Sequence, residues 1–521
     1  MTDAPTPAGP PNPDAVGAFE PDPVAADVSE QMRVRLDKRA RLLAEGREPY
    51  VATVPVTHTL AEIRAAHGEL QPGEETDDVV GVAARVVLIR NTGKLCFATL
   101  QSGEGTRLQA MLSVAATGEE ALARWKADVD LGDHVFVRGN VLSSKRGELS
   151  VLAQEWQLVS KALRPLPNLH HDLSDEVRVR QRYVDLIVRQ DARDMVRTRA
   201  AVLRSLRSTL DVREFIEVET PQLQLIHGGA AARPFSTHLL TYDLPMTLRI
   251  SLELFLKRAV VGGVERVYEI GKNFRNEGID STHSAEFTML EFYQAYGDQF
   301  TAATLTRDLV LNAAEAAGAG KTLIDYRGNE IDIGGEWQWL PILDAVSDAV
   351  GELVTVEGDD RDPGVVERLR RLAAARNVAL QPQWGVGEIV VELYEQLVEP
   401  TLIQPTFVCD YPESVRPLAR GHRSVPGLVE AWDLILGGVE LAPSYTELVD
   451  PVIQRERLTE QSRLAAAGDP EAMALDEDFL RALEYGAPPM GGTGMGVDRL
   501  IMLLTGKPMR EVILFPTVKP E

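Results

Sequence analysis

The chain has 521 residues, which is too long for one hydrophobic core and predicts two or more domains. Hydrophobic residues make up 44% of it and charged residues 25%, as in an ordinary globular protein. No apolar run approaches the roughly 20 residues that cross a bilayer, so no membrane attachment is expected. The net charge of −24 argues against a general nucleic-acid coat protein, but it leaves room for an RNA enzyme with a local basic surface.

The two cysteines, Cys96 and Cys409, lie far apart, so neither a disulfide framework nor a cysteine zinc site is expected. The first 32 residues contain no Lys, no Arg and no apolar core segment, which argues against a secretory or organelle-targeting peptide. The expected compartment is the reducing cytoplasm.

Residues 1–28 are rich in Pro, Ala and Asp, and we expect a disordered tail there. Residues 29–46 predict a basic helix that Ser29 caps and Gly46 ends. Its basic side chains suit either a solvated face or contacts with RNA phosphates.

Residues 77–160 predict a small barrel. Tight-turn signals occur at Asn91-Thr-Gly and Lys145-Arg-Gly, and the expected strands cover 79–90, 95–101, 108–112, 134–141 and 149–159. Five short strands suit a closed barrel such as the OB-fold. Arg164-Pro-Leu-Pro then forms a stiff linker. The expected domains are 29–163, with the helix and barrel, and 174–521, where helices and strands alternate and 300–400 reads as a mostly helical insertion.

Residues 266–296 predict two antiparallel strands joined by a loop that begins at Gly278. Strand side chains alternate between faces, so one face collects most of the polar residues. These are Glu269, Asn273, Arg275 and Glu277 on the first strand, with Phe287, Met289, Glu291 and Tyr293 on the second. The opposite face, with Tyr268, Phe274 and Phe292 among its members, is the expected core side. The polar face looks toward either solvent or a cleft.

Two further clusters could carry chemistry. Gly492, Gly494 and Gly496 strip one strand face of side chains, which suits either a flat ligand or close packing. The acids Asp433, Glu440 and Glu447 lie in an apolar stretch; hard oxygen ligands suit Mg²⁺, and strand-end salt bridges are the alternative.

In their order and spacing, these stretches resemble the three signature motifs of class II aminoacyl-tRNA synthetases. Phe215-Ile-Glu-Val-Glu-Thr-Pro resembles motif 1, with Pro221 as its hallmark. Phe274-Arg-Asn-Glu-Gly, with the segment that starts at His283, resembles motif 2, and Gly494-Met-Gly-Val-Asp-Arg-Leu resembles motif 3. Within this class the similarity is greatest to the lysyl-tRNA synthetases, over residues 30–516.

This resemblance implies an α+β fold, in which helices flank an antiparallel sheet of six to seven strands, with an N-terminal OB-fold that reads the anticodon. It implies a homodimer formed through motif 1. It also implies activation of L-lysine with ATP to lysyl-adenylate, with Mg²⁺, and transfer to the 3′ end of tRNA(Lys).

The resemblance also assigns residues to roles. Those implied for ATP are Arg275, Glu277, His283, Phe287 and Arg499, with Arg275 and Arg499 as the catalytic pair. Those implied for Mg²⁺ are Asp433 and Glu440. Those implied for lysine are Gly229, Glu253, Glu291, Tyr293, Tyr445 and Glu447. Those implied for the anticodon are Arg90, Phe97, Gln109 and Glu148.

Two carboxylates and a phenol around one pocket suit a long cation, because a buried ammonium must be charge-paired. For Glu253, a structural pair with Arg249 or Lys257 is the alternative, and for Phe97 it is a place in the barrel core. Four departures from the commonest family pattern cluster near the amino-acid pocket. They are Pro443 and Val449, each in place of Asn, Ser251-Leu252 in place of Ala-Pro, and Thr247 in place of Tyr.

These departures leave other functions open. One is a paralogue that adenylates lysine or an analogue for another acceptor. A second is a non-catalytic tRNA-binding protein, and a third is the soluble part of a lysyl-lipid system.

Overall fold

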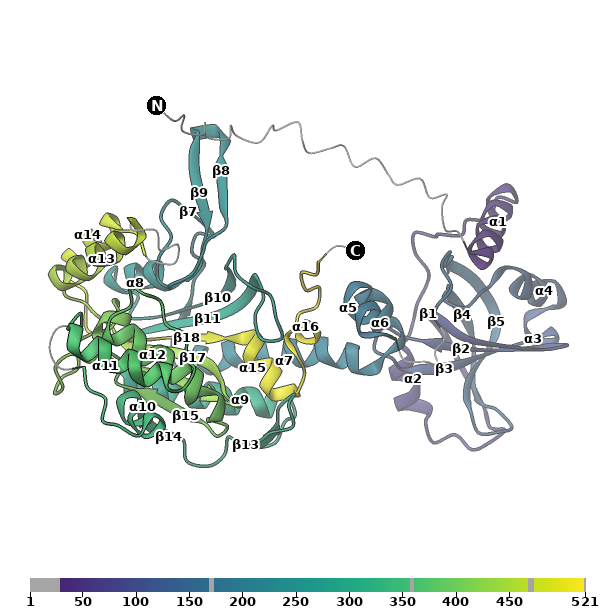
Figure 1. Ribbon diagram of the computed structural model, residues 1–521. Helices are drawn as coiled ribbons and strands as arrows, with labels where there is room; N and C mark the ends of the chain where they lie inside the picture. Colours follow the sequence, from purple (N-terminus) through teal and green to yellow (C-terminus); the bar gives the residue numbers. More distant parts are fainter. Residues whose placement is uncertain (1–28, 168–172, 357–359, 467–472, 520–521) are drawn as a thin grey trace. The chain divides into compact units, whose positions relative to one another are not determined.

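The computed structural model describes residues 29–167, 173–356, 360–466 and 473–519. The tail expected to be disordered, 1–28, lies outside the described residues. The chain forms two compact units. One contains the described residues up to Ser174 together with Leu186–Arg193, and the other contains Asp175–Asp185 and the chain from Asp194 onward (Figure 1).

The first unit is built on a closed five-stranded barrel. Around the barrel the strands follow the order β1-β2-β3-β5-β4. Their bounds are β1 Glu75–Thr92, β2 Leu95–Gln101, β3 Arg107–Ser113, β4 His134–Ser143 and β5 Leu149–Ser160. Val82, Ala84 and Val86 alternate along β1 and are at most 3% exposed, so the apolar face of the strand fills the interior. The five strands and the OB-fold barrel predicted from the sequence are confirmed.

Four helices accompany the barrel: α1 Glu30–Ala44, α2 Leu60–His67, α3 Val114–Thr117 and α4 Glu119–Asp128. Ser29 caps α1 as predicted, because its Oγ accepts a hydrogen bond from the Met32 amide at 3.3 Å. Helix α2 was not predicted, although Thr59 and Glu62 form a reciprocal capping box at its start.

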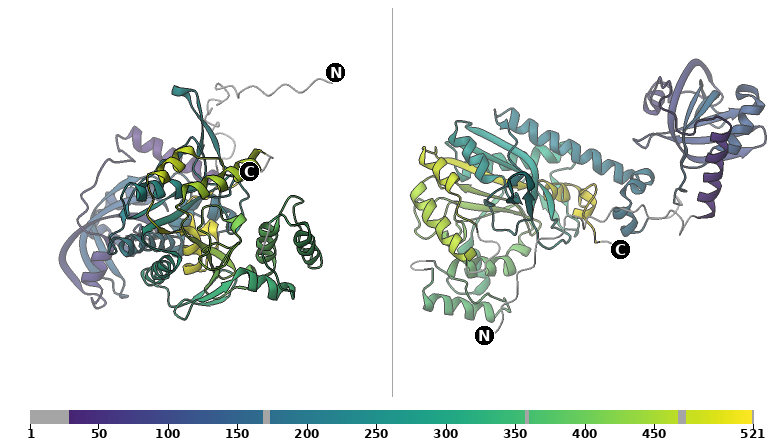
Figure 2. Two further views of the ribbon diagram at one scale, coloured as in Figure 1. Left: turned by 90° about the vertical axis from the view of Figure 1, so that its left-hand side faces the viewer. Right: turned by 90° about the horizontal axis from the view of Figure 1, so that it is seen from above.

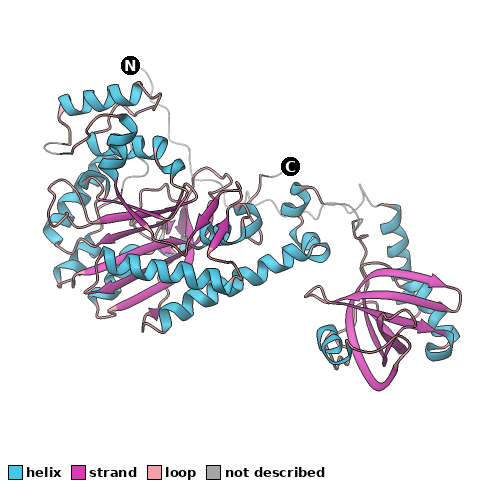
Figure 3. Ribbon diagram, turned by 90° about the horizontal axis from the view of Figure 1, so that it is seen from below, coloured by secondary structure: helices cyan, strands magenta, loops and turns pink. Residues whose placement is uncertain are grey.

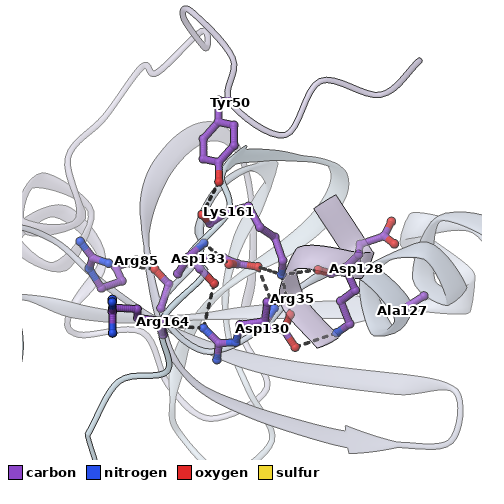
Figure 4. Close-up of polar contacts among 12 residues, drawn as sticks. Arg35, Tyr50, Arg85, Ala127, Asp128, Asp130, Asp133, Lys161 and Arg164 are labelled. Atoms are coloured by element: carbon purple, nitrogen blue, oxygen red, sulfur yellow. Dashed lines mark hydrogen bonds and ion pairs between the residues drawn. The ribbon is translucent and has the colours of Figure 1, made fainter. Parts of the chain in front are cut away.

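The basic residues of α1 contact the barrel itself. Arg35 donates to the Ala162 carbonyl oxygen at 2.9 Å, and Lys38 pairs with Asp130 at 2.7 Å. The buried Lys161 lies beside them and donates to Asp133 Oδ2 at 2.8 Å (Figure 4). Part of the positive charge of α1 therefore holds the helix on the barrel, a use that the sequence analysis did not consider.

The second unit contains an eight-stranded sheet in the order β14-β15-β16-β17-β18-β11-β10-β6. The strands are β6 Ile216–Glu217, β10 Arg266–Phe274, β11 Glu286–Ala295, β14 Gln338–Pro341, β15 Thr406–Cys409, β16 Ala431–Leu436, β17 Val439–Thr446 and β18 Met490–Gly496. Neighbours are antiparallel, except that each edge strand, β14 and β6, runs parallel to its partner. The antiparallel sheet of an α+β fold is confirmed, with one short strand added at each edge.

Helices cover both faces of this sheet (Figure 3). Phe292 belongs to the core cluster shared with α7 Gln190–Asp211, α9 Gln299–Ala316 and α15 Val497–Thr505. Its neighbour Tyr293 faces the other way and packs with α8 Glu253–Val261. On that second face a separate core holds α10 Ile342–Val350, α11 Pro363–Ala374 and α12 Val386–Leu397.

The remaining elements surround the sheet. They are α5 Asp175–Arg180, α6 Arg182–Val188, α13 Pro451–Ala466, α14 Glu477–Glu484, α16 Met509–Val512, the pair β12 Thr322–Ile324 and β13 Glu330–Asp332, and the three-residue 3-10 helices Leu240–Tyr242, Glu399–Thr401 and Glu413–Val415. A small sheet of β7 Leu223–Gln224, β8 Ser236–Leu239 and β9 Leu244–Leu248 extends away from the main sheet as an arm (Figures 1 and 2).

The segment 300–400 is not simply a mostly helical insertion. It contains β12, β13 and β14, and β14 joins the main sheet through Trp339, which pairs with Phe407. Periodicity missed these strands because each has only three or four residues. Within the described ranges, no helix combines the length and apolar character needed to cross a membrane.

Candidate functional site

The first candidate site is a pocket on the second unit, where β10, β11, β17 and the start of α15 meet. Its lining contains all five residues assigned to ATP from the sequence: Arg275, Glu277, His283, Phe287 and Arg499. Glu440, Pro443 and Gly496 also line it. Residues separated by more than 200 positions in the chain therefore meet at one cavity.

Arg275 lines this pocket from the loop that follows β10. The prediction that Arg275 and Glu277 belong to the first strand is wrong, because β10 ends at Phe274. The Arg275 amide donates to the Ala285 carbonyl oxygen at 2.9 Å, after which the loop leaves the ladder. The Arg275 guanidinium carbon lies 5.2 Å from the centre of the Phe287 ring. Burial lowers the pKa of Arg275 below its ordinary value, which marks a cation with few protein partners to stabilise it.

Arg499 lines the same pocket from the first turn of α15. It donates to the Glu440 carbonyl oxygen at 2.7 Å and to His283 Nε2 at 3.1 Å. The other ring nitrogen of His283 lies 2.9 Å from Asp280 Oδ2. Burial alone would raise the pKa of Asp280, but hydrogen bonds from Thr282 and His283 hold it at about 2. The two ring nitrogens of His283 thus connect Asp280 with Arg499.

Asp498 holds these parts together and was missed as a functional residue. It is 1% exposed, and its Oδ2 accepts from the Thr288 amide at 2.7 Å. Its Oδ1 pairs with Arg199 at 2.5 Å, and Arg199 also donates to Thr288 Oγ1 at 2.9 Å. Asp498 thus ties the helix that carries Arg499 to the strand that carries Phe287. In the sequence, the position of Asp498 directly before Arg499, at the start of an apolar helix, could have indicated this role.

The second candidate site is a buried cluster of acidic and phenolic side chains, close to Arg275 of the first site. Glu253, Glu291, Tyr293 and Glu447 are each at most 5% exposed. Tyr293 interacts electrostatically with all three glutamates and with Tyr445. Tyr445 therefore joins the four other side chains that were assigned to lysine. These residues lie up to 194 positions apart in the sequence. The packing of α8 against β11 and the end of β17 brings them together.

Glu291 accepts most of its hydrogen bonds from the segment just before α8. Its Oε1 accepts from the Leu252 amide at 3.0 Å and from Ser251 Oγ at 3.1 Å. Its Oε2 lies 3.3 Å from the Tyr293 hydroxyl, which donates to it. Burial nevertheless raises the pKa of Glu291 to about 7. Glu291 is therefore poised to gain a cationic partner.

Two glycines make room for this pocket. Gly229 has φ +86°, and a Cβ there would come within 2.9 Å of Ser251 Oγ. Gly492 lies opposite Tyr293 on β18, and a Cβ there would come within 2.3 Å of Glu447 Oε1. Packing therefore accounts for Gly492, whereas Gly496 lines the nucleotide-sized pocket. The packing alternative is therefore observed at Gly492, and a flat ligand against the strand stays a prediction for Gly496.

The alternative considered for Glu253 is also observed. Lys257 Nζ donates to Glu253 Oε1 at 2.7 Å and forms an ion pair with Glu447. Arg249 does not pair with Glu253; it pairs with Glu269 at 2.7 Å. The expectation that the polar face of β10 looks toward solvent or a cleft is wrong at Glu269, because Glu269 is buried in this pair with Arg249.

Asp433 and Glu440, the expected magnesium ligands, engage cations of the protein. Asp433 pairs with Arg416, and Glu440 Oε1 lies 3.8 Å from Arg499. Among the described residues no group of three or more His, Cys, Asp or Glu has a metal-binding arrangement. However, Asp433 Oδ1 is buried and accepts no hydrogen bond from the part of the chain that the structure describes, and the half-buried carboxylate of Glu440 is a second hard oxygen donor. This donor set fits a Mg²⁺ ion that shares its coordination with phosphate.

The third candidate site is a groove on the barrel. Its lining includes the four residues assigned to the anticodon, Arg90, Phe97, Gln109 and Glu148. Phe97 is half-buried between the fully buried Cys96 and Ala98, which excludes the barrel core as its place. The Arg90 guanidinium carbon lies 5.1 Å from the centre of the Phe97 ring. The sequence analysis missed four further basic residues of the groove: Arg64, Arg107, Lys145 and Arg146.

Comparison with known proteins agrees with this architecture. A family profile described as tRNA synthetases class II (D, K and N) matches residues 174–519. The chain belongs to this family of class II tRNA synthetases. A profile described as an OB-fold nucleic acid binding domain matches residues 80–159 of the synthetase.

Relatives of this synthetase match it over almost its whole length. The lysine–tRNA ligase of Kineococcus radiotolerans is 56% identical over 502 residues, which cover 96% of this chain and 99% of that protein. The lysine–tRNA ligase of Mycolicibacterium gilvum is 56% identical over 495 residues, which cover 95% of this chain and 98% of that protein. The lysylphosphatidylglycerol biosynthesis bifunctional protein LysX of Mycobacterium ulcerans is 48% identical over 94% of this chain, but the match covers 44% of its own length.

The departures from the usual synthetase pattern have visible consequences. Ser251 and Leu252, which replace Ala-Pro, both donate to Glu291; a proline at 252 has no N–H to donate. Pro443 lies opposite Asp433 on β17 and lines the nucleotide-sized pocket. Val449 packs against the apolar side of α8.

Proposed function

We propose that this class II synthetase is a lysine–tRNA ligase. It activates L-lysine with ATP to lysyl-adenylate and then transfers the lysyl group to the 3′ end of tRNA(Lys). The observation that carries the proposal is the buried cluster of Glu253, Glu291 and Glu447 beside the pocket of Arg275 and Arg499. An acidic pocket of this kind favours a cationic amino acid and repels an anionic one. The names of the relatives at 56% identity support the same substrate.

In the nucleotide pocket, Phe287 stacks on adenine, and Glu277 and His283 hold the ATP. Arg275 contacts the α-phosphate and the amino-acid carboxylate, and Arg499 contacts the γ-phosphate. The lowered pKa of Arg275 supports this role, because burial outweighs the attraction of the nearby carboxylates and an anionic ligand would further stabilise the charged guanidinium. Asp433 and Glu440 would hold Mg²⁺, which when bound supplies positive charge next to the phosphates.

In the lysine pocket, Glu291 and the Gly229 backbone receive the α-amino group. Glu253, Tyr293 and Glu447 surround the side-chain ammonium, with Tyr445 beside them. Gly229 suits its part because no side chain fits between it and Ser251.

The first step forms a bond between a lysine carboxylate oxygen and the α-phosphorus of ATP, as the bond to the pyrophosphate oxygen breaks in line. The residues supply no nucleophile. Arg275 and Arg499 act by holding two anions together and offsetting their charge, which is positioning and electrostatic catalysis. The terminal adenosine hydroxyl of tRNA then attacks the adenylate carbonyl and releases AMP.

The barrel groove reads the anticodon. Phe97 stacks on an unpaired base, and Arg90, Gln109 and Glu148 bind base edges and phosphate. Five basic residues of the groove give this surface a local positive charge although the whole chain carries −24. Such an enzyme works in the cytoplasm, where tRNA is charged.

The active form is a homodimer built around motif 1. Apolar side chains close to Pro221 in the sequence are between 39% and 76% exposed, and so many exposed apolar side chains within one short stretch support a self-association surface. They are Val212, Ile216, Leu223, Leu225 and Ile226.

Amino-acid-dependent ATP–pyrophosphate exchange, run with each of the twenty amino acids, tests the proposal, and a charging assay with tRNA(Lys) completes it. We expect exchange with lysine alone and charging of tRNA(Lys). Exchange without charging would favour a paralogue that serves another acceptor, and no exchange with any amino acid would favour a non-catalytic tRNA-binding protein. Arg275→Ala should abolish exchange while the protein stays folded; near-normal exchange would contradict the assignment of Arg275.

A further inference from the structure

Lys257 is a buried cation that none of the expected roles employs. It lies one helical turn after Glu253 on α8 and is 1% exposed. Its Nζ donates to Glu253 Oε1 at 2.7 Å and pairs with Glu447 Oε2. Burial alone would lower the pKa of Lys257, but the two carboxylates outweigh burial and raise it, so this ammonium stays charged.

The two glutamates bonded to Lys257 are those proposed for the side chain of the substrate. Glu447 is 2% exposed, and its Oε1 is buried without a hydrogen-bond partner within the described residues. Beside this oxygen lie the ring of Tyr293 and the backbone of Gly492, since a Cβ at Gly492 would come within 2.3 Å of both side chains. Lys257 therefore occupies one side of the glutamate pair, and a buried acceptor remains for a ligand.

The net charge of Glu253, Glu447 and Lys257 indicates a role for Lys257. Two carboxylates and one ammonium leave a net charge of −1, which one substrate ammonium balances. Without Lys257, two buried carboxylates close to one point would not both stay ionised, and one would take up a proton. Burial and the neighbouring carboxylates of Glu253 and Glu291 raise the pKa of Glu447, while Lys257 acts in the opposite direction. Tyr293 and Tyr445 face the same carboxylates.

We propose that Lys257 is a specificity-determining positioning residue, which holds Glu253 and Glu447 ionised and oriented so that the pocket presents one net negative charge to the ε-ammonium of lysine. The inference rests on the proposed lysine activation and names a residue beyond it. Lys257 acts through the glutamates and does not itself touch the substrate.

The test compares Lys257→Met with wild type in lysine-dependent ATP–pyrophosphate exchange between pH 6 and 9. We expect KM for lysine at pH 7 to rise about tenfold or more, with KM for ATP within about twofold, because the loss is confined to the ammonium site. The pH at which KM for lysine reaches its plateau should rise by about one unit, because the cation that keeps the glutamates ionised is gone. Lys272→Met is the matched control, since Lys272 lies on β10, pairs among the described residues with Glu286 alone, at 3.5 Å, and does not line the pocket of Arg275.

A double variant guards against simple misfolding. Lys257→Met with Glu253→Gln removes one positive and one negative charge and leaves a single ionised glutamate. We expect the double variant to melt at a higher temperature than Lys257→Met and to return the pH plateau toward that of wild type. A purely structural role for Lys257 predicts no recovery of the plateau.

Each outcome has a distinct meaning. Folded Lys257→Met with an unchanged KM and plateau would overturn the inference and leave lysine activation standing. If Lys257→Met does not fold, an unshifted plateau in the double variant supports the inference and a shifted one overturns it. Absence of lysine-dependent exchange in wild type would instead defeat the proposed function.

Discussion

Gly492 and Tyr293 are directly opposed in the ladder between β18 and β11, and a Cβ on Gly492 would lie 2.3 Å from Tyr293 Cε1. The same atom would lie 2.3 Å from Glu447 Oε1. The absent side chain at Gly492 thus creates the space in which Tyr293 and Glu447 stand side by side.

Gly492→Ala should therefore displace both residues. We expect KM for lysine to rise about tenfold or more, KM for ATP to change little, and stability to fall by about 1–3 kcal/mol through overpacking. Exchange kinetics and thermal melting measure these effects. Gly421→Ala is the control, because a Cβ there meets no atom within 4 Å. Equal KM values for lysine in the two variants would argue against Gly492 as a wall of the pocket.

The pH dependence of lysine binding should report Glu291. Burial raises its pKa to about 7, so a proton occupies the carboxylate below that pH and must leave before an α-ammonium binds. KM for lysine should rise as pH falls below about 7, approaching tenfold per unit, while KM for ATP stays nearly flat. A KM for lysine that does not change between pH 6 and 8 would contradict this role.

Ser251→Ala should shift that pH dependence upward. Ser251 Oγ donates to Glu291 Oε1 at 3.1 Å, and loss of this donor disfavours the ionised carboxylate. We expect the pH below which KM for lysine rises to shift up by about one unit, because that shift corresponds to the free energy of one hydrogen bond to a charged group. Ser208→Ala, an exposed serine on α7, should leave the profile unchanged. A downward shift would mean that Ser251 does not stabilise the charged form.

Phe97→Ala should separate tRNA recognition from amino-acid activation. Stacking of a base on an aromatic ring contributes about 1–3 kcal/mol, so KM for tRNA(Lys) should rise about 5- to 150-fold. Exchange without tRNA should be unaffected. Leu88→Ala, on β1 and 58% exposed outside the groove, is the control. An unchanged KM for tRNA would remove Phe97 from the reading surface.

Ile216→Asp should weaken self-association. Ile216 is 55% exposed on the edge strand β6, and a carboxylate there would be buried without a partner in a dimer. Sedimentation velocity should show a dimer for wild type and a monomer for the variant at micromolar concentration. Val452→Asp, 66% exposed on α13, should sediment as wild type does. Identical sedimentation of all three proteins would place the dimer surface elsewhere or exclude a dimer.

Patterns of alternation and turn residues were sufficient for the barrel strands and for the strand pair β10 and β11. Phe292 and Tyr293 show why: adjacent residues on a strand face opposite ways, so one enters the core and the other the site. The same patterns did not predict elements of three or four residues, such as β12, β13 and β14. The four-residue strand β14 is stabilised by pairing with β15, which lies more than 60 residues later in the chain. A pattern confined to neighbouring residues therefore cannot predict it.

The sequence by itself determined the class of synthetase, the barrel, and which side chains would gather at the nucleotide pocket, because order and spacing of motifs are properties of the chain. Only the tertiary structure decided what each charge meets. Glu269 turned out to pair with Arg249, and Lys257 to bridge Glu253 and Glu447. Electrostatic interactions depend on the distance between charges in space, and packing between segments sets that distance in a folded chain. Lys257 and Glu447, for example, lie 190 positions apart in the sequence.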